Sequence, residues 1–423
     1  MKHHLTAAAL ATLLSLGAAA PVLAAETLPG ASVESLLALA KENNPEYASM
    51  RHEAQAAAER VVPAGALPDP RLRTEWMDVT KGGSQAPTLW PSDVGNTKYT
   101  LMQDLPWFGK RDLKKNIAQQ EAQASDGKAQ VTWTELATQV KVAHAQRYYL
   151  VHTQQLTQQL LDLTTRLASV AQVRYAGGLA MQQDAIRAQM EQTAMQTELV
   201  SLAGEARQAD ARLNALLGRP SSAALARPEL LPPMPAPAQL DADALLVRAR
   251  QNNPQLFTEE ARIRSATLSR ELTRKNRYPD FTLAISPTQV QNGISEWGLM
   301  LELNIPLQQG ARRAQEREAQ AMLDAAQSRQ QAVANQLRSD LSENLIALDT
   351  AQRTEQLAKT SLQPQAELTF QTAMAGYENG KLDFATLLDA QRQVRAARQS
   401  QLKAQLEEQM RLAEIEKLAG ESL

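Results

Sequence analysis

The sequence contains no cysteine, and aromatic residues make up only 4% of its 423 residues. The absence of cysteine excludes disulfides, thiolate metal sites, cysteine nucleophiles and an N-terminal cysteine that could carry lipid. Long apolar runs are also scarce, because no stretch after the first 25 residues approaches the roughly 18 apolar residues of a membrane-spanning helix. Acidic and basic residues nearly balance, with a formal net charge of -2 at pH 7, so nothing indicates nucleic acid as a partner.

The N-terminus has the pattern of a secretory signal peptide. Lys2, His3 and His4 precede an apolar run over 5–20, and small residues follow at the spacing of a cleavage site. We predict that residues 1–25 form the signal peptide, with cleavage after Ala24 or Ala25. The mature chain is then exported, and any place that it has in a membrane must come from strands.

An internal duplication organises the rest of the chain. The glycine turn at 173–179 returns at 375–381, and four pairs of landmarks share one offset of 202: Tyr175 and Tyr377, Gly178 and Gly380, Gln189 and Gln391, Gly218 and Gly420. We predict two structural repeats, 26–220 and 241–423, joined by a proline-rich linker over 221–240. Each repeat contains a helical hairpin whose tip is the glycine turn, since glycine readily adopts positive φ where a helix stops.

Both repeats begin with a helix that is broken by Asn-Asn-Pro, at 43–45 and at 252–254. The first helix is predicted over about 32–62. Apolar and polar residues then alternate with period 2, which predicts strands at 71–76 and 98–105 and again at 281–286 and 297–305. The polar, glycine-containing connections at 81–96 and 289–295 indicate two β-hairpins with solvent-facing loops.

Strands with one apolar and one polar face are what a transmembrane β-barrel requires. The alternative is a soluble antiparallel sheet that lies on a layer of helices. Four strands cannot close a barrel, and an open edge cannot lie in lipid. A barrel therefore needs several copies of the chain, and three copies supply twelve strands.

Each hairpin leads through a proline and a glycine into a very long helix. The segments 110–175 and 312–377 each contain 66 residues, which as α-helix would reach roughly 100 Å. Two shorter helices, one over 179–217 and the next one broken at Pro254, together match the length of one long helix and provide the return path. The apolar stripe of these helices is too narrow for an ordinary globular core. The sequence therefore predicts the wall of a hollow tube, mainly α with a small β part.

At this point the chain resembles the TolC family of outer-membrane efflux ducts over nearly its whole mature length. The Asn-Asn-Pro breaks, the Leu67-Pro68-Asp69-Pro70 segment before the first strand, the 106–110 exit and the two tip turns carry the resemblance. The compact length and that Leu-Pro-Asp-Pro segment look most like the branch that serves heavy-metal efflux pumps of the resistance-nodulation-division (RND) type.

The resemblance implies a homotrimer, in which a 12-stranded barrel in outer-membrane lipid continues as an α-helical barrel across the periplasm. The tips are then expected to meet a periplasmic adaptor that connects the duct to an inner-membrane RND pump. Such a duct performs no chemistry and needs no cofactor. It passively conducts exported toxic compounds, here expected to be heavy-metal cations.

Two groups of residues are assigned from this resemblance. The expected adaptor-contacting tips consist of Tyr175, Gly177, Gly178, Leu179, Tyr377, Gly380, Lys381 and Leu382. Turns that only stop two helices would explain the glycines equally well. The expected gate consists of Asp184, Asp383 and Asp389. Thr386 replaces a second aspartate common in the family, and a solvated helix face is the alternative role for Asp389.

Other classes of function find less support in the sequence. His144 and His152 lack the i, i+4 spacing of a helical metal pair, and helical methionines such as Met190 are usually packing residues. No nucleophile elbow, P-loop or dinucleotide fingerprint is present, so no enzyme is expected. A periplasmic coiled-coil adaptor or scaffold without a barrel is the rival. It would need one helical hairpin and a compact β domain rather than two hairpins interrupted by strand pairs.

Overall fold

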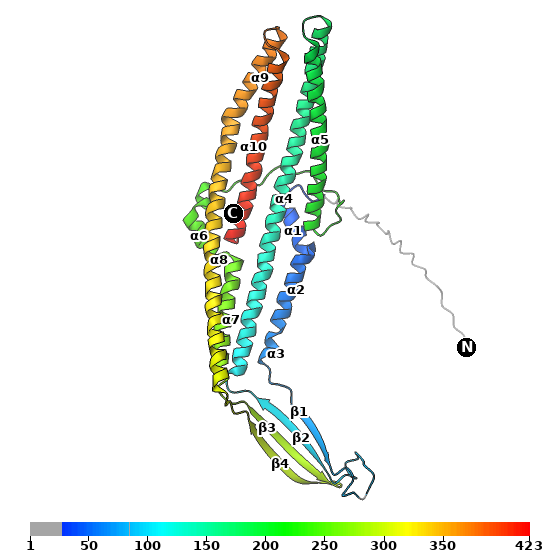
Figure 1. The fold of residues 1–423 in the computed structure, drawn as a ribbon, viewed down its shortest axis with the longest axis vertical. Helices are drawn as coiled ribbons and strands as arrows, with labels where there is room; N and C mark the ends of the chain where they lie inside the picture. Colours follow the sequence, from blue (N-terminus) through cyan, green and yellow to red (C-terminus); the bar gives the residue numbers. More distant parts are fainter. Residues whose placement is uncertain (1–27, 84) are drawn as a thin grey trace, which may run out of the picture.

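The computed structural model describes residues 28–83 and 85–423, so the predicted signal peptide lies outside the described residues. The described chain is long and thin, with helices along most of its length and a sheet at one end (Figure 1). None of the helices in this part of the chain combines the length and the apolar character needed to cross a lipid bilayer.

The two halves of the chain repeat one order of elements. The first half consists of α1 (Val33–Asn43), α2 (Pro45–Glu59), α3 (Val61–Gly65), β1 (Arg71–Met77), β2 (Asn96–Leu105), α4 (Lys110–Ala176) and α5 (Gln182–Leu216). The second consists of η1 (Pro237–Leu240), α6 (Ala242–Asn252), α7 (Pro254–Lys275), β3 (Phe281–Val290), β4 (Gly293–Leu303), α8 (Gln309–Leu357), η2 (Ala358–Leu362), α9 (Gln363–Glu378) and α10 (Phe384–Ala419). The internal duplication predicted from the glycine turns is thus present as a duplicated helix, strand pair and helical hairpin.

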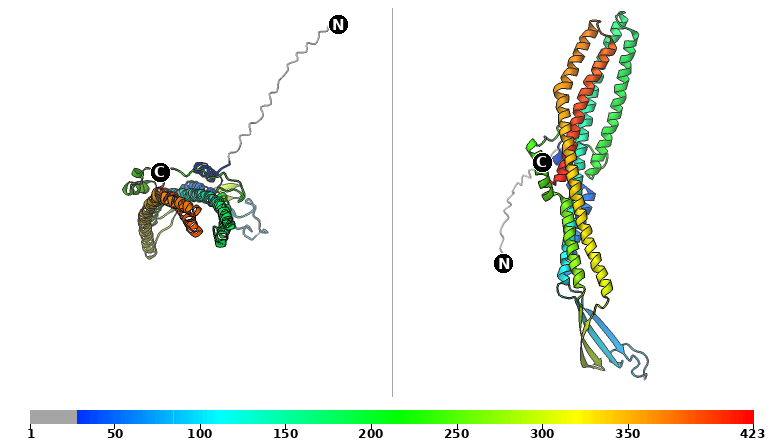
Figure 2. Two further views of the ribbon diagram at one scale, coloured as in Figure 1. Left: turned by 90° about the horizontal axis from the view of Figure 1, so that it is seen from above. Right: turned by 60° about the vertical axis from the view of Figure 1, so that its left-hand side comes forward.

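The helices form a single curved layer rather than a bundle with a central core (Figure 2). Toward the tips, α10 packs between α4 and the α8–α9 helix, and α5 packs on the other side of α4. Toward the sheet, α7 takes the place of α10, and α2 and α3 take the place of α5. Buried apolar residues gather in several small clusters along this layer, for example Leu36, Val140 and Leu213 at mid-height. This arrangement confirms the predicted wall-like helices with thin contacts on their flanks.

The Asn-Asn-Pro breaks are junctions between the start and the end of each half. The side chains of Asn44 and Asn253 cap the helices that follow them, and their amides donate to the carbonyl oxygens of Leu216 (3.0 Å) and Leu418 (2.9 Å). Directly beyond those carbonyls, Gly218 and Gly420 lie so close to the breaks that an added Cβ would approach the carbonyl oxygens of Asn43 (2.4 Å) and Asn252 (2.3 Å). The end of α5 is therefore fixed to the break between α1 and α2, and the end of α10 to the break between α6 and α7.

The four strands form one antiparallel sheet in the order β1-β2-β3-β4, so β2 and β3 pair across the two halves. Register places Leu72, Leu101, Ile285 and Leu299 in one row across the sheet, on the same face as Leu283 and Leu301. This apolar face is open: Leu299 is 85% exposed and Leu72 is 71% exposed. The opposite face carries small and polar residues, of which Ala284, Ser286 and Thr100 are buried.

The burial of the two faces of the sheet distinguishes a membrane-facing sheet from a soluble sheet that lies on helices, the two alternatives that the period-2 sequence pattern left open. A soluble sheet packs its apolar face on a second layer and solvates its polar face. Here the polar face is the more buried one: Ser286 and Thr100 are buried and their hydroxyls lie 3.1 Å apart in a hydrogen bond, while Leu72 and Leu299 stay exposed. An apolar exterior with a polar interior is the arrangement of a strand that faces lipid.

A clamp of polar and aromatic residues joins the sheet to the helices. The buried Lys110 ammonium, at the start of α4, donates to the Asp280 carboxylate (2.9 Å) and to the Tyr278 carbonyl (3.0 Å) before β3. Asp280 also accepts from the Trp107 amide at 2.7 Å, and the Trp107 ring stacks against Tyr278 and Phe281. The exit of the first strand pair is thereby fixed to the beginning of the second.

Two elements differ from the prediction. The second long helix is not one continuous α-helix over 312–377, because a π-helical turn at Ala358–Leu362 separates α8 from α9. Pro364 explains the interruption, since proline lacks the backbone N–H of the α-helical ladder and its ring clashes with the preceding turn. The loop predicted at 289–295 shrinks to a two-residue turn, because Gln291 adopts a φ of 53° and lets Val290 pair with Gly293.

Candidate functional site: the hairpin tips

The two tips are helix-ending turns of the same design. Gly178 and Gly380 have φ values of 70° and 71°. The amide of the following residue reaches back five residues, from Leu179 to the Arg174 carbonyl (2.7 Å) and from Lys381 to the Gly376 carbonyl (2.8 Å). These bonds satisfy carbonyl groups that a helix end leaves open. The turns place Gly177, Gly178, Leu179, Gly380, Lys381 and Leu382 at the exposed end of the molecule.

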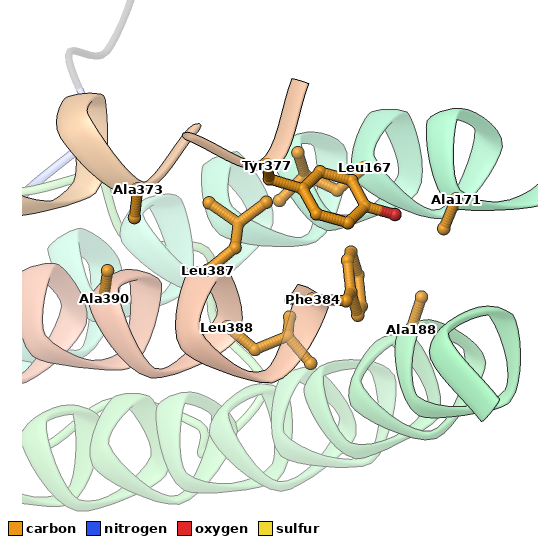
Figure 3. Packing of buried hydrophobic residues seen from close by; sticks show 9 residues of the cluster. All are labelled: Leu167, Ala171, Ala188, Ala373, Tyr377, Phe384, Leu387, Leu388 and Ala390. Carbon is orange, nitrogen blue, oxygen red and sulfur yellow. The ribbon is translucent and has the colours of Figure 1, made fainter. Parts of the chain in front are cut away.

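The two equivalent tyrosines have opposite environments. Tyr175 is 44% exposed, whereas Tyr377 is 2% exposed and packs against Phe384 with ring centroids 5.3 Å apart. Figure 3 shows Tyr377 within a cluster contributed by both hairpins, which consists of Leu167, Ala171, Ala188, Ala373, Tyr377, Phe384, Leu387, Leu388 and Ala390. Tyr377 therefore belongs to the packing between the hairpins, and of the two tyrosines only Tyr175 is open to a partner.

Arg174 joins the tip of the first hairpin to that of the second. Its guanidinium donates to the Glu378 carbonyl at 2.8 Å and lies 5.1 Å from the centroid of the Tyr377 ring. At the equivalent position the second repeat has Gly376, where a Cβ would approach the side chain of Leu382 to 2.6 Å. We call these two contacts of Arg174 the clasp; only the first repeat supplies it. The sequence analysis missed Arg174. It could have been noticed because the position 202 residues later is Gly376 and not an arginine, so the two repeats differ there.

The predicted gate aspartates fall into two groups. Asp184 and Asp383 lie close enough to interact, and Arg187 interacts with both. Burial raises the pKa of Asp184; Arg187 opposes this rise, and the negative charge of Asp383 adds to it. Burial likewise raises the pKa of Tyr377, and the Asp184 charge contributes to that rise. Asp184 is therefore the more buried carboxylate of this pair.

Asp383 and Thr386 form a helix cap. The Asp383 carboxylate accepts from the Thr386 amide (2.9 Å) and hydroxyl (2.5 Å) at the start of α10. These bonds, with the side-chain bond as the larger cause, lower the pKa of Asp383. The threonine that replaces a family aspartate thus orients the aspartate three residues before it.

Asp389 lies apart from the other two aspartates, on an exposed face of α10. Its carboxylate accepts from Gln393 at 3.1 Å, one turn along the same helix. Beside it, Arg392 forms an ion pair with the buried Glu191 of α5 at 2.6 Å, and Arg395 pairs with Glu198 of α5. Two ionic contacts thus tie the hairpins together below the tip cluster, and neither was predicted.

The described residues contain no group of three or more His, Cys, Asp and Glu side chains that could hold a metal ion. His144 is 1% exposed within α4, and the His152 ring lies against Tyr148 with centroids 4.1 Å apart. Both histidine side chains therefore take part in packing.

Replacing Arg174 by alanine is expected to loosen the tips. The substitution removes the hydrogen bond to the Glu378 carbonyl and the cation over the Tyr377 ring, contacts worth about 1–3 kcal/mol together. Hydrogen exchange of the 376–382 amides in the purified protein should accelerate by roughly tenfold or more. Arg166→Ala, on the same helix, is the matched control and should change nothing at the tip. Unaltered exchange in the Arg174 variant would show that the clasp does not hold the turn.

The class of protein follows from the geometry. A one-layer helical wall continues into an open sheet whose apolar face is exposed, which defines the protomer of a membrane channel with a long helical extension.

Comparison with known proteins gives the particular family. The family model described as "Outer membrane efflux protein" matches residues 36–219 and 245–421. The chain belongs to the outer membrane efflux protein family. It is therefore an outer-membrane efflux channel of the TolC type, with a periplasmic helical extension and no enzymatic activity. Family membership decides against the adaptor or scaffold without a barrel.

Individual relatives agree with this placement. A cobalt-zinc-cadmium resistance protein, CzcC of Cupriavidus metallidurans, is 25% identical over 394 residues, which cover 89% of this chain and 87% of that protein. A membrane protein from Pseudomonas aeruginosa has a TM-score of 0.79 at 20% identity, covering 93% of this chain and 91% of that one. The outer membrane protein VceC of Vibrio cholerae has a TM-score of 0.78 at 16% identity, covering 92% and 96%.

Proposed function

We propose that three copies of this chain form the exit duct of a tripartite efflux pump. The observation that carries the proposal is the pair of open edges. β1 and β4 each pair with only one strand, although an edge cannot remain open in lipid. The edge helices match them: α5 exposes Ile186, Met190 and Val200, and the α8–α9 helix exposes Ile346, Leu357 and Leu368. A neighbouring copy would cover both the strand edges and the helix edges.

The mass of the detergent-extracted protein tests this assembly. Light scattering after size exclusion, with the detergent subtracted, should give about three protomers for protein taken from a purified outer-membrane fraction. A monomer or dimer would overturn the twelve-stranded assembly, because four strands per copy close a barrel only when several copies combine.

We infer that the tips bind a periplasmic adaptor of an inner-membrane RND pump. The support is exposure: Leu179 is 71% exposed at the first tip, and Lys381 and Leu382 are exposed at the second. Because the chain contains no cysteine, a single cysteine at Leu179 or Leu382 is the only reactive thiol in its variant. Each should cross-link to the adaptor in intact cells, whereas cysteine at Leu230 in the linker, which is about as exposed as Leu179, should not. Equal cross-linking at all three positions would remove the tips from the interface.

We further propose heavy-metal cations as the exported substrate. The support is the similarity to a cobalt-zinc-cadmium resistance protein over most of both chains. Deletion of the gene should lower the tolerated concentration of Zn²⁺, Co²⁺ or Cd²⁺ and leave tolerance of organic toxicants unchanged. The reverse pattern would assign the duct to an organic substrate without affecting its assignment as a channel.

The gate proposal concerns Asp389. Its exposed position on α10 is compatible with a ring of three carboxylates near the threefold axis, where like charges would hold back anions. Asp389→Ala is expected to loosen the closed state and to raise single-channel conductance in planar bilayers. Asp324→Ala serves as the control, because Asp324 is an exposed carboxylate of α8 that also accepts from a glutamine one turn away and is not among the gate residues. Unchanged conductance would remove Asp389 from the gate and leave a solvated helix face.

A further inference from the structure

The second long helix contains an interruption that the first lacks. The π-helical turn at Ala358–Leu362 ends two residues before Pro364, whereas α4 is α-helical over its whole length from Lys110 to Ala176. Single π-turns within α-helices often mark functional positions, and a proline weakens the ladder at such a point. The helix pair α8 and α9 therefore has a built-in site for bending against α10, the neighbour on which both pack.

Amide side chains of α10 bridge this turn. Gln401 donates to the Glu355 carboxylate at 2.7 Å, before the turn, and accepts from Gln363 at 2.5 Å, after it. Gln405 also donates to Glu355, at 3.3 Å. The Glu355 carboxylate thus accepts hydrogen bonds from two amides of α10 and links α8 to α10 just before the turn.

Glu408 lies one turn along α10 from these amides and is 9% exposed. No described residue forms an ion pair with it, and the charge that acts on it is that of Glu355. The arginines of the neighbouring segments are engaged elsewhere: Arg353 with Asp349 (2.9 Å), Arg411 with Glu407 (2.6 Å), and Arg147 of α4 with Asp210 (2.6 Å). Lys359 and Lys403 are exposed, and the linker passes α10 here through uncharged Pro232 and Met234.

A buried carboxylate beside a second carboxylate favours its neutral form. Burial raises the pKa of Glu408 to about 7, and the Glu355 charge contributes to the rise. The Glu408 carboxyl therefore changes charge near neutral pH.

We propose that Glu408 and the π-turn form a proton-sensitive hinge between α10 and the α8–α9 helix. Protonation of Glu408 favours the packed arrangement. Loss of the proton leaves a charged group buried next to Glu355 and favours an arrangement in which the helices separate at the turn and Glu408 reaches water.

The sign of the pH dependence follows from proton linkage. The packed state binds the Glu408 proton more tightly than a state in which the carboxyl is solvated and titrates near its ordinary value of 4.5. Packing is therefore favoured fully below that ordinary value, and it weakens as the pH rises toward 7. Each pH unit in this window changes the ratio of packed to separated molecules by up to about tenfold, and the whole window by on the order of 100-fold.

Hydrogen exchange of the full-length protein in detergent tests the hinge. Exchange rates of the 353–366 amides, corrected for intrinsic chemistry, should slow at least tenfold between pH 7.5 and pH 5.5 in the wild type. Glu408→Gln should exchange slowly at both pH values. Glu343→Gln, at an exposed glutamate of α8 whose carboxylate accepts from Ser339, should behave as the wild type. A wild-type profile without pH dependence, or the same dependence in Glu408→Gln, would overturn the proposal.

A second variant keeps the test decisive if Glu408→Gln fails to assemble. Glu355→Gln removes the neighbouring charge and should shift the midpoint of the exchange profile to lower pH; an unchanged midpoint would contradict the pairing of the two carboxyls. These measurements need neither transport nor a partner, so their failure would leave the efflux channel untouched, and a failed export assay would leave the hinge untouched.

Discussion

Valine in place of Gly420 is expected to be among the most destabilising single substitutions in this chain. Gly420 has a φ of 75°, and an added Cβ would lie 2.3 Å from the Asn252 carbonyl oxygen. A β-branched residue in that conformation costs about 1–2 kcal/mol, and displacing the packed backbone adds about 1–3 kcal/mol more. The net free energy of unfolding of a folded domain is only about 5–15 kcal/mol, so the amount of folded and assembled protein should fall sharply.

Thermal unfolding followed by circular dichroism, together with the yield of assembled protein, measures this effect. Gly218→Val should have the same consequence, because its Cβ would meet the Asn43 carbonyl in the same way. Gly204→Ala is the matched control: Gly204 lies within α5 with nothing near its Cβ position, so alanine should stabilise the helix by about 0.5–1 kcal/mol. Equal melting temperatures for Gly420→Val and the wild type would show that the junction is free to shift.

Arginine in place of Leu299 should prevent insertion of the sheet into the membrane. Leu299 lies in the middle of β4 within the exposed apolar row, where a charged residue at the bilayer midplane costs about 2–4 kcal/mol. Three copies in one barrel would triple the penalty. On a water-exposed sheet the same change would cost almost nothing, because surface substitutions usually stay within about 0.5 kcal/mol.

Fractionation of cells measures the outcome of this substitution. The Leu299→Arg chain should leave the outer-membrane fraction and be degraded or accumulate in the periplasm. Leu230→Arg, at a similarly exposed leucine in the proline-rich linker, should assemble normally. Normal assembly of both variants would place the apolar row in water and would contradict its contact with lipid.

Much of the fold was predictable because its signals are local. The tip glycines, the Asn-Asn-Pro caps and the period-2 strands each depend on residues within a few positions of one another. The π-turn was predictable in principle from Pro364 and was missed. The tight β3–β4 turn was not, since it depends on Gln291 adopting a positive φ that its residue type does not favour.

The candidate site was less predictable because it depends on contacts between the repeats. Nothing local distinguishes the exposed Tyr175 from the buried Tyr377; packing against Phe384 and the approach of Arg174 from the other hairpin create the difference. The same holds for Glu408, which resembles Glu407 in sequence and is distinguished by burial alone. The roles of the tip residues and of Asp184, Asp383 and Asp389 stay predictions until the experiments above are done.

The β1–β2 and β3–β4 connections differ greatly in length, and this difference determines which part of the channel can be reached from outside the cell. At the end of the sheet away from the helices, β3 and β4 meet in a two-residue turn, while residues 78–95 connect β1 and β2 and expose Leu89 and Trp90. Almost all of the surface that an antibody, a bacteriophage or an external protease could reach therefore belongs to the first repeat. An external agent that recognises the channel would therefore meet the β1–β2 connection and not the two-residue β3–β4 turn.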